Sequence, residues 1–521
     1  MHLPSPSSSP AQPQRDVFEN ITNEKSHTRP DATPRPHNPW SYLPTPAKDS
    51  TDFGAKRQAV EDGSPRKRVK TGSSKSNQEG GDAVEEIDMV ARAAVRMRRN
   101  CWLNTLRNPN PRSAGQFAST RILQSYVSSN KSDLFKWDAL DDGFINPPYA
   151  CSYSHSAKAG KAPHLALATE HGTVHILDTR KRLDWDVEPQ RTTIQPHHNG
   201  IFDVKWNCTD ELLATCSADY SVRIIDVGSG ESIATLRGHS GSVKCVAWDP
   251  ENDKLLSTGG RDGDIQLWDL RLPQAEGSIA SPLATISGAH DGLDPKSRKR
   301  KTATQTSVTN LVRCDDMTLV SSGSSDGLLR CWDLRFTTST KKSKAAKTKR
   351  TLALLSSPID PTTLHNSRRP RGILSLTNGT GPTSGLIFAL GADSRIHTYN
   401  ASSLEPLSIN YTHPNLKTNS SFYLSISASP CGRFLASGSA GMQGSAFLFD
   451  ISNAARPYSQ AEPGIELRAQ VGEIGPVDWA EGMLATCADE STVRIWRPDI
   501  EVYRTCIENP EERRWDWSWA L

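Results

Sequence analysis

The sequence has no long hydrophobic run. No stretch approaches the roughly eighteen consecutive apolar residues that cross a bilayer, and the N-terminus lacks the basic-then-apolar layout of a secretory leader. We therefore expect a soluble intracellular protein without a membrane partner. Hydrophobic residues make up 36% of the 521 residues, which is too few for the whole chain to be packed core, so part of it should be disordered.

Short paired cysteine spacings are also missing. The ten cysteines are scattered, mostly in apolar contexts such as "LATC", which argues against a disulfide framework and against a zinc cluster. We expect buried thiols, no metal site and no cofactor. The net charge of +3 is too small over this length to indicate nucleic-acid binding by the whole chain.

The first 80 residues are rich in proline, serine and charge. Such a composition buries too little apolar surface to fold, so residues 1–80 are predicted to be disordered. Within them, "KRQAVEDGSPRKRVK" carries two basic clusters spaced like a bipartite nuclear import signal, and a solvated charge run is the alternative. The signal residues are Lys56, Arg57, Arg66, Lys67, Arg68 and Lys70. The nucleus is therefore the expected location.

Residues 81–145 are expected to hold an amphipathic helix followed by a linker. From 82 to 106 the sequence has no glycine or proline, and its apolar residues recur at helical spacing. Acidic residues gather near the start and arginines near the end, which complements the helix dipole. Such a helix either packs on its own domain or docks in a partner's groove, and both possibilities remain open.

From residue 146 to 498 the chain repeats. Short apolar or alternating segments end at seven positions, with intervals close to the length of a four-stranded blade and two longer intervals. The seven positions are Asp178, Asp226, Asp269, Asp333, Asn400, Asp450 and Trp496. This pattern predicts an all-β fold, a seven-bladed β-propeller with polar insertions at 274–306 and 337–371 and a C-terminal tail at 499–521.

The third repeat resembles the WD-repeat family. "GH" at 238–239 precedes the strand "VKCVAW" and then "LLSTGGRDGDIQLWD". The resemblance implies a buried hydrogen-bonded tetrad that fixes the geometry of the blade. Its members would be His239, Thr258, Asp262 and Trp268.

Other repeats carry partial versions of this tetrad. The fourth offers Ser322, Asp326 and Trp332 with His290 displaced upstream, and the seventh offers Thr486, Glu490 and Trp496. The same residue types occur in hydrolytic triads, but their recurrence in repeat after repeat favours a structural role over a single active site. We therefore expect no catalytic residue and a protein that is not an enzyme.

Two repeats also share an arginine. "GGRDGDIQLWDLR" ends at Arg271 and "GSSDGLLRCWDLR" ends at Arg335, each two residues past the aspartate of Trp-Asp. No internal hydrogen bond is expected to require arginine at this point. Guanidinium groups at rigid strand ends can make forked bonds to a partner, so we predict a protein-binding patch on two neighbouring blades.

The repeat region is similar to the denticleless (Cdt-two) family of WD-repeat proteins. The similarity rests on "INPPYACSYS", "HNGIFDVKW", the two Trp-Asp-Leu-Arg boxes, "ISGAH" before a basic loop, and "NSSFYLSISASP". The resemblance implies a substrate receptor that docks on the propeller adaptor, the damaged-DNA-binding subunit, of cullin-4 RING ubiquitin ligases. The residues that would contact the adaptor are Trp268, Asp269, Arg271, Trp332, Asp333 and Arg335.

The resemblance further implies which proteins the receptor captures. In this family they are replication and cell-cycle proteins that carry a degron with a basic residue and are bound to the sliding clamp on DNA, so contact with chromatin is indirect. Ubiquitination then leads to proteasomal degradation. The chain ends at "RRWDWSWAL" without a clamp-binding motif of its own, which is more typical of a fungal member.

Substrate is expected over the central opening of the propeller. Positions three and five residues after the tetrad histidine, and their equivalents in other repeats, would face it; they are Phe202, Ser242, Lys244, Thr309, Phe422 and Glu473. A basic degron residue needs a carboxylate partner, and Glu473 is the acid in this set. No small-molecule substrate is expected.

One alternative is a chromatin-associated WD-repeat scaffold without a ligase role. Its basic loops at 296–301 and 341–350 would then contact DNA phosphate, and binding would depend strongly on salt. An enzyme is the third possibility, and it would need a catalytic group that the sequence does not reveal.

Overall fold

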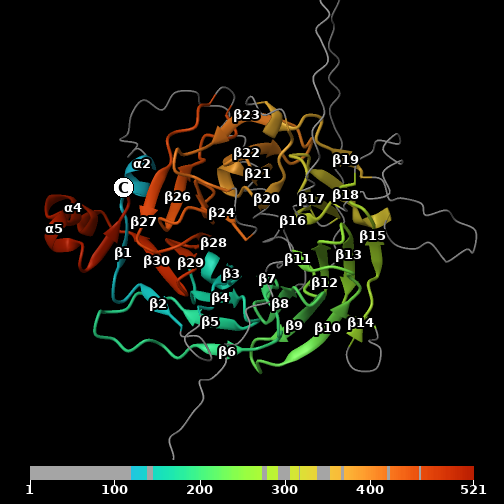
Figure 1. Ribbon diagram of the computed structural model, residues 1–521, viewed down its shortest axis with the longest axis horizontal. Helices are drawn as coiled ribbons and strands as arrows, with labels where there is room; N and C mark the ends of the chain where they lie inside the picture. The colour runs from blue at the N-terminus through green and yellow to red at the C-terminus, as the bar shows by residue number, and fades with distance from the viewer. Residues whose placement is uncertain are drawn as a thin grey trace, which may run out of the picture. The chain divides into compact units, whose positions relative to one another are not determined.

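The computed structural model describes residues 119–137, 145–272, 279–291, 306–315, 317–336, 353–364, 369–418, 423–456 and 459–521. The region predicted to be disordered, the nuclear signal and the 82–106 helix lie outside these residues, as does most of both insertions. The described strands form seven sheets arranged in a ring (Figure 1). This arrangement confirms the prediction of a seven-bladed propeller.

The first four blades follow one another in chain order, and each begins with its innermost strand. Blade 1 has β3 (Pro148–Tyr153), β4 (His164–Thr169), β5 (Val174–Asp178) and β6 (Thr192–Ile194), and blade 2 has β7 (Ile201–Trp206), β8 (Leu212–Ser217), β9 (Ser221–Asp226) and β10 (Ser232–Arg237), with β14 (Ile279–Ala280) beside β10. Blade 3 has β11 (Val243–Trp248), β12 (Leu255–Gly260), β13 (Ile265–Asp269) and β15 (Ala284–Ile286), and blade 4 has β16 (Val308–Asp315), β17 (Thr318–Gly323), β18 (Arg330–Asp333) and β19 (Leu355–Ser356).

The remaining blades complete the ring. Blade 5 has β20 (Ile373–Asn378), β21 (Leu386–Gly391), β22 (Arg395–Asn400) and β23 (Pro406–Tyr411), blade 6 has β24 (Ile426–Ala428), β25 (Phe434–Ser437), β26 (Ser445–Asp450) and β27 (Ile465–Arg468), and blade 7 begins with β28 (Ile474–Ala480), β29 (Met483–Ala488) and β30 (Thr492–Pro498). The described helices are short: α2 (Ser119–Gln124), α3 (His155–Lys158), α4 (Ile500–Glu508), α5 (Pro510–Arg513) and the 3-10 turns η2 (Leu334–Phe336), η3 (Pro361–Thr363) and η4 (Gly381–Thr383).

The N-terminal side of the chain closes the ring. β1 (Tyr126–Ser129) and β2 (Leu134–Lys136) both pair with β30, and β31 (Trp517–Trp519) pairs with the outer side of β1. The propeller therefore extends beyond the predicted limits of 146 and 498. The expected linker supplies blade strands, and the expected tail forms α4, α5 and β31, because the outer edge of β30 would otherwise leave its backbone groups unpaired.

Neighbouring blades are held together by apolar side chains and by a repeated polar contact. Trp206 Nε1 donates to the Ser152 carbonyl of the preceding blade at 2.9 Å, and Trp248 Nε1 donates to the Lys205 carbonyl at 3.0 Å. Both indoles are nearly buried. Each contact satisfies a buried indole N–H and fixes the spacing between two first strands.

The tetrad of blade 3 has the expected connections. His239 Nδ1 lies 3.0 Å from Asp262 Oδ2, and His239 Nε2 lies 2.8 Å from Thr258 Oγ1. Trp268 Nε1 donates to the same hydroxyl at 2.9 Å. All four side chains are buried, so the network links the loop before β11 to β12, the following turn and β13.

In blade 4 the hydroxyl belongs to Ser321, and the expectation of Ser322 was wrong. Trp332 Nε1 and His290 Nε2 each lie 2.8 Å from Ser321 Oγ. The strand register explains this, because Leu319 pairs with Trp332 as Leu256 pairs with Trp268, which makes Ser321 the equivalent of Thr258. Ser322 points to the other side of the sheet.

The histidine of blade 4 does not form the hydrogen bond to an aspartate that His239 forms in blade 3. His290 Nδ1 is buried and has no hydrogen-bond partner among the described residues, while Asp326 accepts from the Leu328 backbone at 3.2 Å. Burial, with repulsion from Arg330, lowers the pKa of His290 to about 3. The imidazole is therefore neutral at physiological pH, and among the described residues its side-chain hydrogen bond is the one to Ser321.

Blade 7 uses a glutamine in place of the histidine. Thr486 Oγ1 donates to Gln470 Oε1 at 2.6 Å and accepts from Trp496 Nε1 at 3.0 Å. The expected Glu490 instead accepts a hydrogen bond from Thr492 at 2.9 Å. The indole and hydroxyl positions thus persist although the other two members of the tetrad change.

Replacing Ser321 should cost more stability than replacing its neighbour. Ser321→Ala leaves the Trp332 N–H and His290 Nε2 without a partner in a buried site, so we expect the free energy of unfolding to fall by about 2 kcal/mol. Ser322→Ala removes a contact to the half-exposed Thr309 and should cost about 1 kcal/mol or less. Urea unfolding of both variants measures the difference, and equal losses would contradict the register described here.

Candidate protein-interaction sites

The propeller has two faces with different chemistry. We call the lower face the one at which the third strand of each blade ends, as at Asp178, Asp269 and Asp333. The upper face carries the turns between second and third strands, which include Glu170 and Asp489. Because strands alternate in direction, the first strand of each blade begins at the upper face.

On the lower face, both predicted arginines are locked onto their own aspartates. Arg271 Nε and Nη2 donate to Asp269 Oδ1 and Oδ2 at 2.9 and 2.8 Å. Arg335 repeats the arrangement on Asp333, with its Nε 2.9 Å from Oδ1. This internal pairing was not expected, and it holds each guanidinium in one orientation while the arginine side chains stay 59% and 62% exposed.

The tryptophans of the two boxes are buried inside their blades. Trp268 and Trp332 are 2% and 3% exposed, and their indole N–H groups are used inside the blades. The prediction that they contribute to an adaptor contact stays a prediction, and in this structure their part in it would be indirect. They anchor β13 and β18, and so they position Arg271 and Arg335 at the strand ends.

A third arginine of this kind was missed. Arg180 follows Asp178 at the end of β5, and its Nε donates to Asp178 Oδ2 at 2.9 Å. The segment reads "LDTR", so the Asp-x-Arg spacing was visible, but the absence of tryptophan kept it from being recognised. Blades 1, 3 and 4 therefore carry the same ion pair on one face.

A cavity of about 690 Å³ runs along the central channel, from Tyr149 and Lys244 near the upper face to Pro250 and Pro430 beyond the lower ends of the first strands. All seven first strands or the residues just before them contribute to its lining. Of the predicted substrate-facing residues, Phe202, Lys244 and Thr309 line it. Ser242 lies at the upper end, where its carbonyl accepts from the Arg261 backbone at 2.8 Å. Phe422 is outside the described residues.

Aromatic rings stack across the mouth of this channel. Tyr149 lies between Phe202 and Tyr423, with ring centroids 5.9 and 4.9 Å away and interplanar angles of 4° and 27°. Tyr423 belongs to blade 6 and reaches across Gly475 of blade 7. A Cβ on Gly475 would lie 2.3 Å from the tyrosine ring, so glycine is required for this approach. We call Tyr149, Phe202 and Tyr423 the aromatic stack.

Carboxylates surround one end of the aromatic stack. The Tyr423 hydroxyl donates to Asp489 Oδ1 at 2.8 Å and lies 3.5 Å from Glu473 Oε2. Burial, reinforced by the charge of Glu170, raises the pKa of Asp489. No described basic side chain forms an ion pair with Glu170 or Asp489. The expected Glu473 is therefore part of a larger acidic group. Glu170 and Asp489 were missed because they lie in the turns between second and third strands, outside the positions that were counted from the histidine.

A lysine occupies the other end of the aromatic stack. Lys244 Nζ lies 3.3 Å from the centroid of the Phe202 ring. Burial, with repulsion from Arg261, lowers the pKa of Lys244 to about 8. The channel mouth therefore places a partly buried cation on one side and acidic groups on the other, which suits a peptide that carries a positive charge at a defined position.

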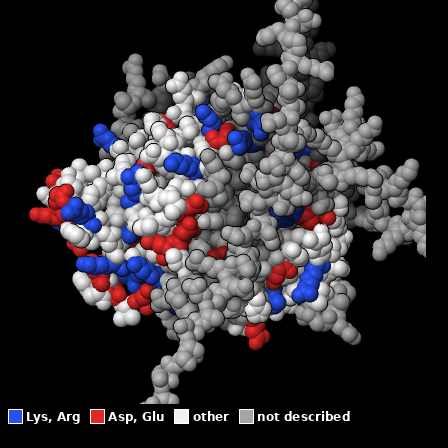
Figure 2. All heavy atoms as spheres, viewed as in Figure 1, with Lys and Arg blue, Asp and Glu red and all other residues white. Residues whose placement is uncertain are grey.

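The described residues contain neither a cluster that could hold a metal ion nor a helix that could span a membrane. No described group of three or more His, Cys, Asp or Glu side chains could hold a metal ion. No helix among the described residues is long and apolar enough to cross a membrane. Figure 2 shows Lys and Arg interspersed with Asp and Glu over the described part of the face in view.

Comparison with known proteins adds a family context. The family "WD domain, G-beta repeat" matches residues 188–226, 230–269 and 297–333. Denticleless protein homolog A of Xenopus laevis is 32% identical over 421 residues, which cover 77% of this chain and 54% of that protein. The human denticleless protein homolog is 30% identical over 74% of this chain and 51% of its own length. The Drosophila melanogaster protein lethal(2)denticleless is 29% identical over 65% and 43%.

The chain spans about half the length of the curated relatives that it matches. Among solved structures, a chain of the structure titled "Crystal Structure of Mitotic Checkpoint Complex" aligns with a TM-score of 0.48 and 17% identity, covering 75% of this chain and 96% of that chain.

Lys244 should give the protein a measurable pH dependence. Its folded pKa of about 8 lies below its ordinary value of 10.5, so between these pH values the unfolded state binds more protons and stability from this group rises with pH. The free energy of unfolding of Lys244→Met, relative to that of the wild type, should therefore be highest below pH 8. The difference should shrink as the pH rises towards 10.5. Urea unfolding from pH 7 to 10.5 measures the difference. The more exposed Lys254→Met serves as control, and a difference independent of pH would contradict the burial of Lys244.

Proposed function

The chain belongs to the denticleless family of WD-repeat proteins, and from this we propose that it is the substrate-recognition subunit of a cullin-4 RING ubiquitin ligase. In this proposal the lower face docks on the propeller adaptor of the ligase, and the upper face receives the protein to be ubiquitinated. The chain itself is a non-catalytic receptor that brings substrate and ligase together.

The observation that carries the proposal is the fixed pair of arginines on adjacent blades. Arg271 and Arg335 end equivalent strands, are oriented by identical contacts to aspartate and remain more than half exposed. Side chains held in one orientation lose little entropy when a partner binds. Arginine is also well suited to forked hydrogen bonds with carboxylates and carbonyls at protein interfaces.

The upper face supports the substrate half of the proposal. The aromatic stack offers flat apolar surface, and Glu170, Glu473 and Asp489 supply negative charge beside it. A degron with a basic residue, displayed by a replication or cell-cycle protein bound to the sliding clamp, has the complementary chemistry. We also place the receptor in the nucleus, on the basis of the two basic clusters between Lys56 and Lys70.

Charge reversal of the two arginines should abolish adaptor capture. We expect Arg271→Glu with Arg335→Glu to lose recovery of the purified adaptor in a pull-down, while circular dichroism shows an intact fold. Arg237→Glu is the matched control, because Arg237 ends β10 at the opposite face. Unchanged recovery by the double variant would remove the role given to the boxes. Failure of the wild type to bind adaptor, with salt-sensitive DNA binding instead, would favour a chromatin scaffold.

Neutralising a charge of the acidic group should weaken substrate binding without changing adaptor binding. Asp489→Asn keeps a hydrogen-bond acceptor for Tyr423 but removes a charge, so we expect roughly tenfold weaker binding of a clamp-bound degron with a basic residue. Glu501→Gln on the exposed start of α4 is the control. If Asp489→Asn weakens the binding of a degron whose basic residue has been replaced by alanine to the same extent, the charge of Asp489 does not recognise that basic residue.

A further inference from the structure

A loop on the lower face exposes several apolar side chains. Residues 179–191 connect β5 and β6, and we call them the blade-1 loop; it projects beyond the strands of blade 1 next to β2 (Figure 1). Leu183, Trp185 and Val187 are 55%, 79% and 91% exposed. Clustered exposed apolar residues on a soluble domain commonly mark a docking surface, since leaving them in water is unfavourable.

The first half of the loop is attached to residues 129–135, which include the end of β1 and the start of β2. Arg182 Nη2 donates to the Ser132 carbonyl at 2.9 Å, and its guanidinium carbon lies 4.8 Å from the centroid of the Phe135 ring. Ser129 Oγ donates to Asp184 Oδ1 at 3.1 Å. Arg182 and Asp184 thus tie the loop to residues 129–135, while Leu183 and Trp185 are turned to solvent.

The second half is also fixed. The Leu183 backbone N–H donates to Asp186 Oδ2 at 2.8 Å, and the Asp186 N–H donates back to the Leu183 carbonyl at 3.0 Å, which closes a tight turn around Trp185. Arg191 Nη1 then donates to the Lys136 carbonyl at 2.8 Å. The loop therefore presents its apolar side chains in a preorganised shape, and such residues dominate binding energy at interfaces.

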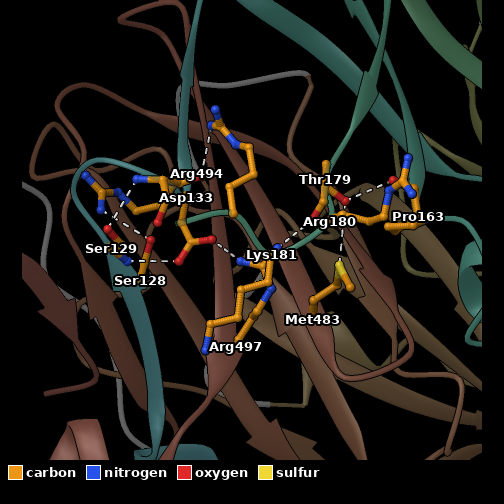
Figure 3. Close-up of polar contacts among 12 residues, drawn as sticks. Ser128, Ser129, Asp133, Pro163, Thr179, Arg180, Lys181, Met483, Arg494 and Arg497 are labelled. Atoms are coloured by element: carbon orange, nitrogen blue, oxygen red, sulfur yellow. Dashed lines mark hydrogen bonds and ion pairs between the residues drawn. The ribbon is translucent and has the colours of Figure 1, made fainter. Parts of the chain in front are cut away.

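The base of the loop is part of the ring closure, as Figure 3 shows. Arg497 at the end of β30 pairs with Asp133 and donates to the Thr179 carbonyl. Thr179 is buried, and its hydroxyl donates to the Pro163 carbonyl at 3.0 Å. Arg180 follows directly, so its guanidinium and the exposed apolar residues share one rigid support.

The surface that borders the loop indicates its partner. Arg180 repeats the geometry of Arg271 and Arg335 and lies on the same face of the ring. Asp184, Asp186 and Glu188 alternate with the apolar residues, so the complementary surface is an apolar pocket with a basic rim. A partner that spans the lower face from blades 3 and 4 to blade 1 would cover both the three arginines and the apolar residues of the blade-1 loop.

We propose that the blade-1 loop is a second anchor for the ligase adaptor, with Trp185 inserted in an apolar pocket of that protein and Arg180 making a third guanidinium contact. This rests on the proposed function. The loop adds apolar burial at one end of an interface that the arginine boxes alone would make almost entirely polar. Interfaces of this kind gain most of their affinity from a few such aromatic and arginine side chains.

The proposal is tested by adaptor affinity. We expect Trp185→Ala and Arg180→Glu in the full chain each to weaken binding of immobilised adaptor by about tenfold or more, chiefly through faster dissociation. The control is Tyr220→Asn, because it removes a 51% exposed aromatic residue from the upper face and asparagine tolerates the positive φ of 67° at this position. The control should bind like wild type.

Hydrogen exchange supplies an independent readout on the unmodified chain. Backbone amides of residues 180–188 should exchange more slowly when adaptor is bound. If Trp185→Ala binds within twofold of wild type, or the loop gains no protection, while Arg271→Glu with Arg335→Glu still loses the adaptor, the second anchor is refuted and the proposed function stands. If the wild type does not bind adaptor at all, the proposed function fails and the anchor fails with it.

Discussion

The pairing of β30 with β1 is the contact on which the rest of the structure depends, because it joins the two ends of the propeller in a single blade. Arg494, buried beneath this pair, donates to Ser128 and Asn130, and Arg497 bonds Asp133. β31 then covers the outer side of β1, so the closing strand has a hydrogen-bonded neighbour on both sides. Closing the ring in this way pairs the outer side of β30 with a strand from the N-terminal side, so the two ends of the propeller cannot separate without breaking these hydrogen bonds. The arginines of the lower face and the channel mouth of the upper face are therefore held in fixed relative positions.

Within the ring, the buried polar networks keep different parts of the tetrad in different blades, and blade 2 keeps His197, Thr215 and Asp219 without an indole. Blade 3 uses all four groups, blade 4 lacks the carboxylate, and blade 7 substitutes Gln470 for the histidine. The indole–hydroxyl bond is common to these three blades, at 2.9, 2.8 and 3.0 Å. It joins the second and third strands near the lower end of each blade, where a buried indole N–H would otherwise be unsatisfied. The histidine and aspartate add a link to the upper turn, and other polar groups can replace that link.

The seven blades and their boundaries were largely predictable, because each third strand ends in a recognisable Asp, Asn or Trp after an apolar run. Errors arose where the sequence does not show which residues of neighbouring strands pair. Ser322 was predicted as the tetrad hydroxyl, but the neighbouring Ser321 occupies that position. Phe422 was predicted to face the channel, where the neighbouring Tyr423 joins the aromatic stack. Tyr149 belongs to a blade without the reference histidine, and Glu170 and Asp489 lie in turns between second and third strands, which were not counted. The closing strand β1 has four residues and no repeat signature, so only the tertiary structure identifies it as part of blade 7. The internal pairing of Arg271 with Asp269 was equally invisible, since spacing alone does not give side-chain direction.

The opposite placement of the two candidate sites has a mechanical consequence. First strands of six or seven residues separate the acidic aromatic mouth from the arginine ends in several blades, and these strands are bound to their neighbours on both sides by buried indoles and carboxylates. A ligand on the upper face therefore leaves the lower face accessible, and occupancy of one need not block the other. Because the closed ring is rigid, a partner on the lower face fixes the direction in which the channel mouth points. A receptor that presents one protein to a second gains from this, since orientation is set by the fold and no hinge has to be ordered on binding.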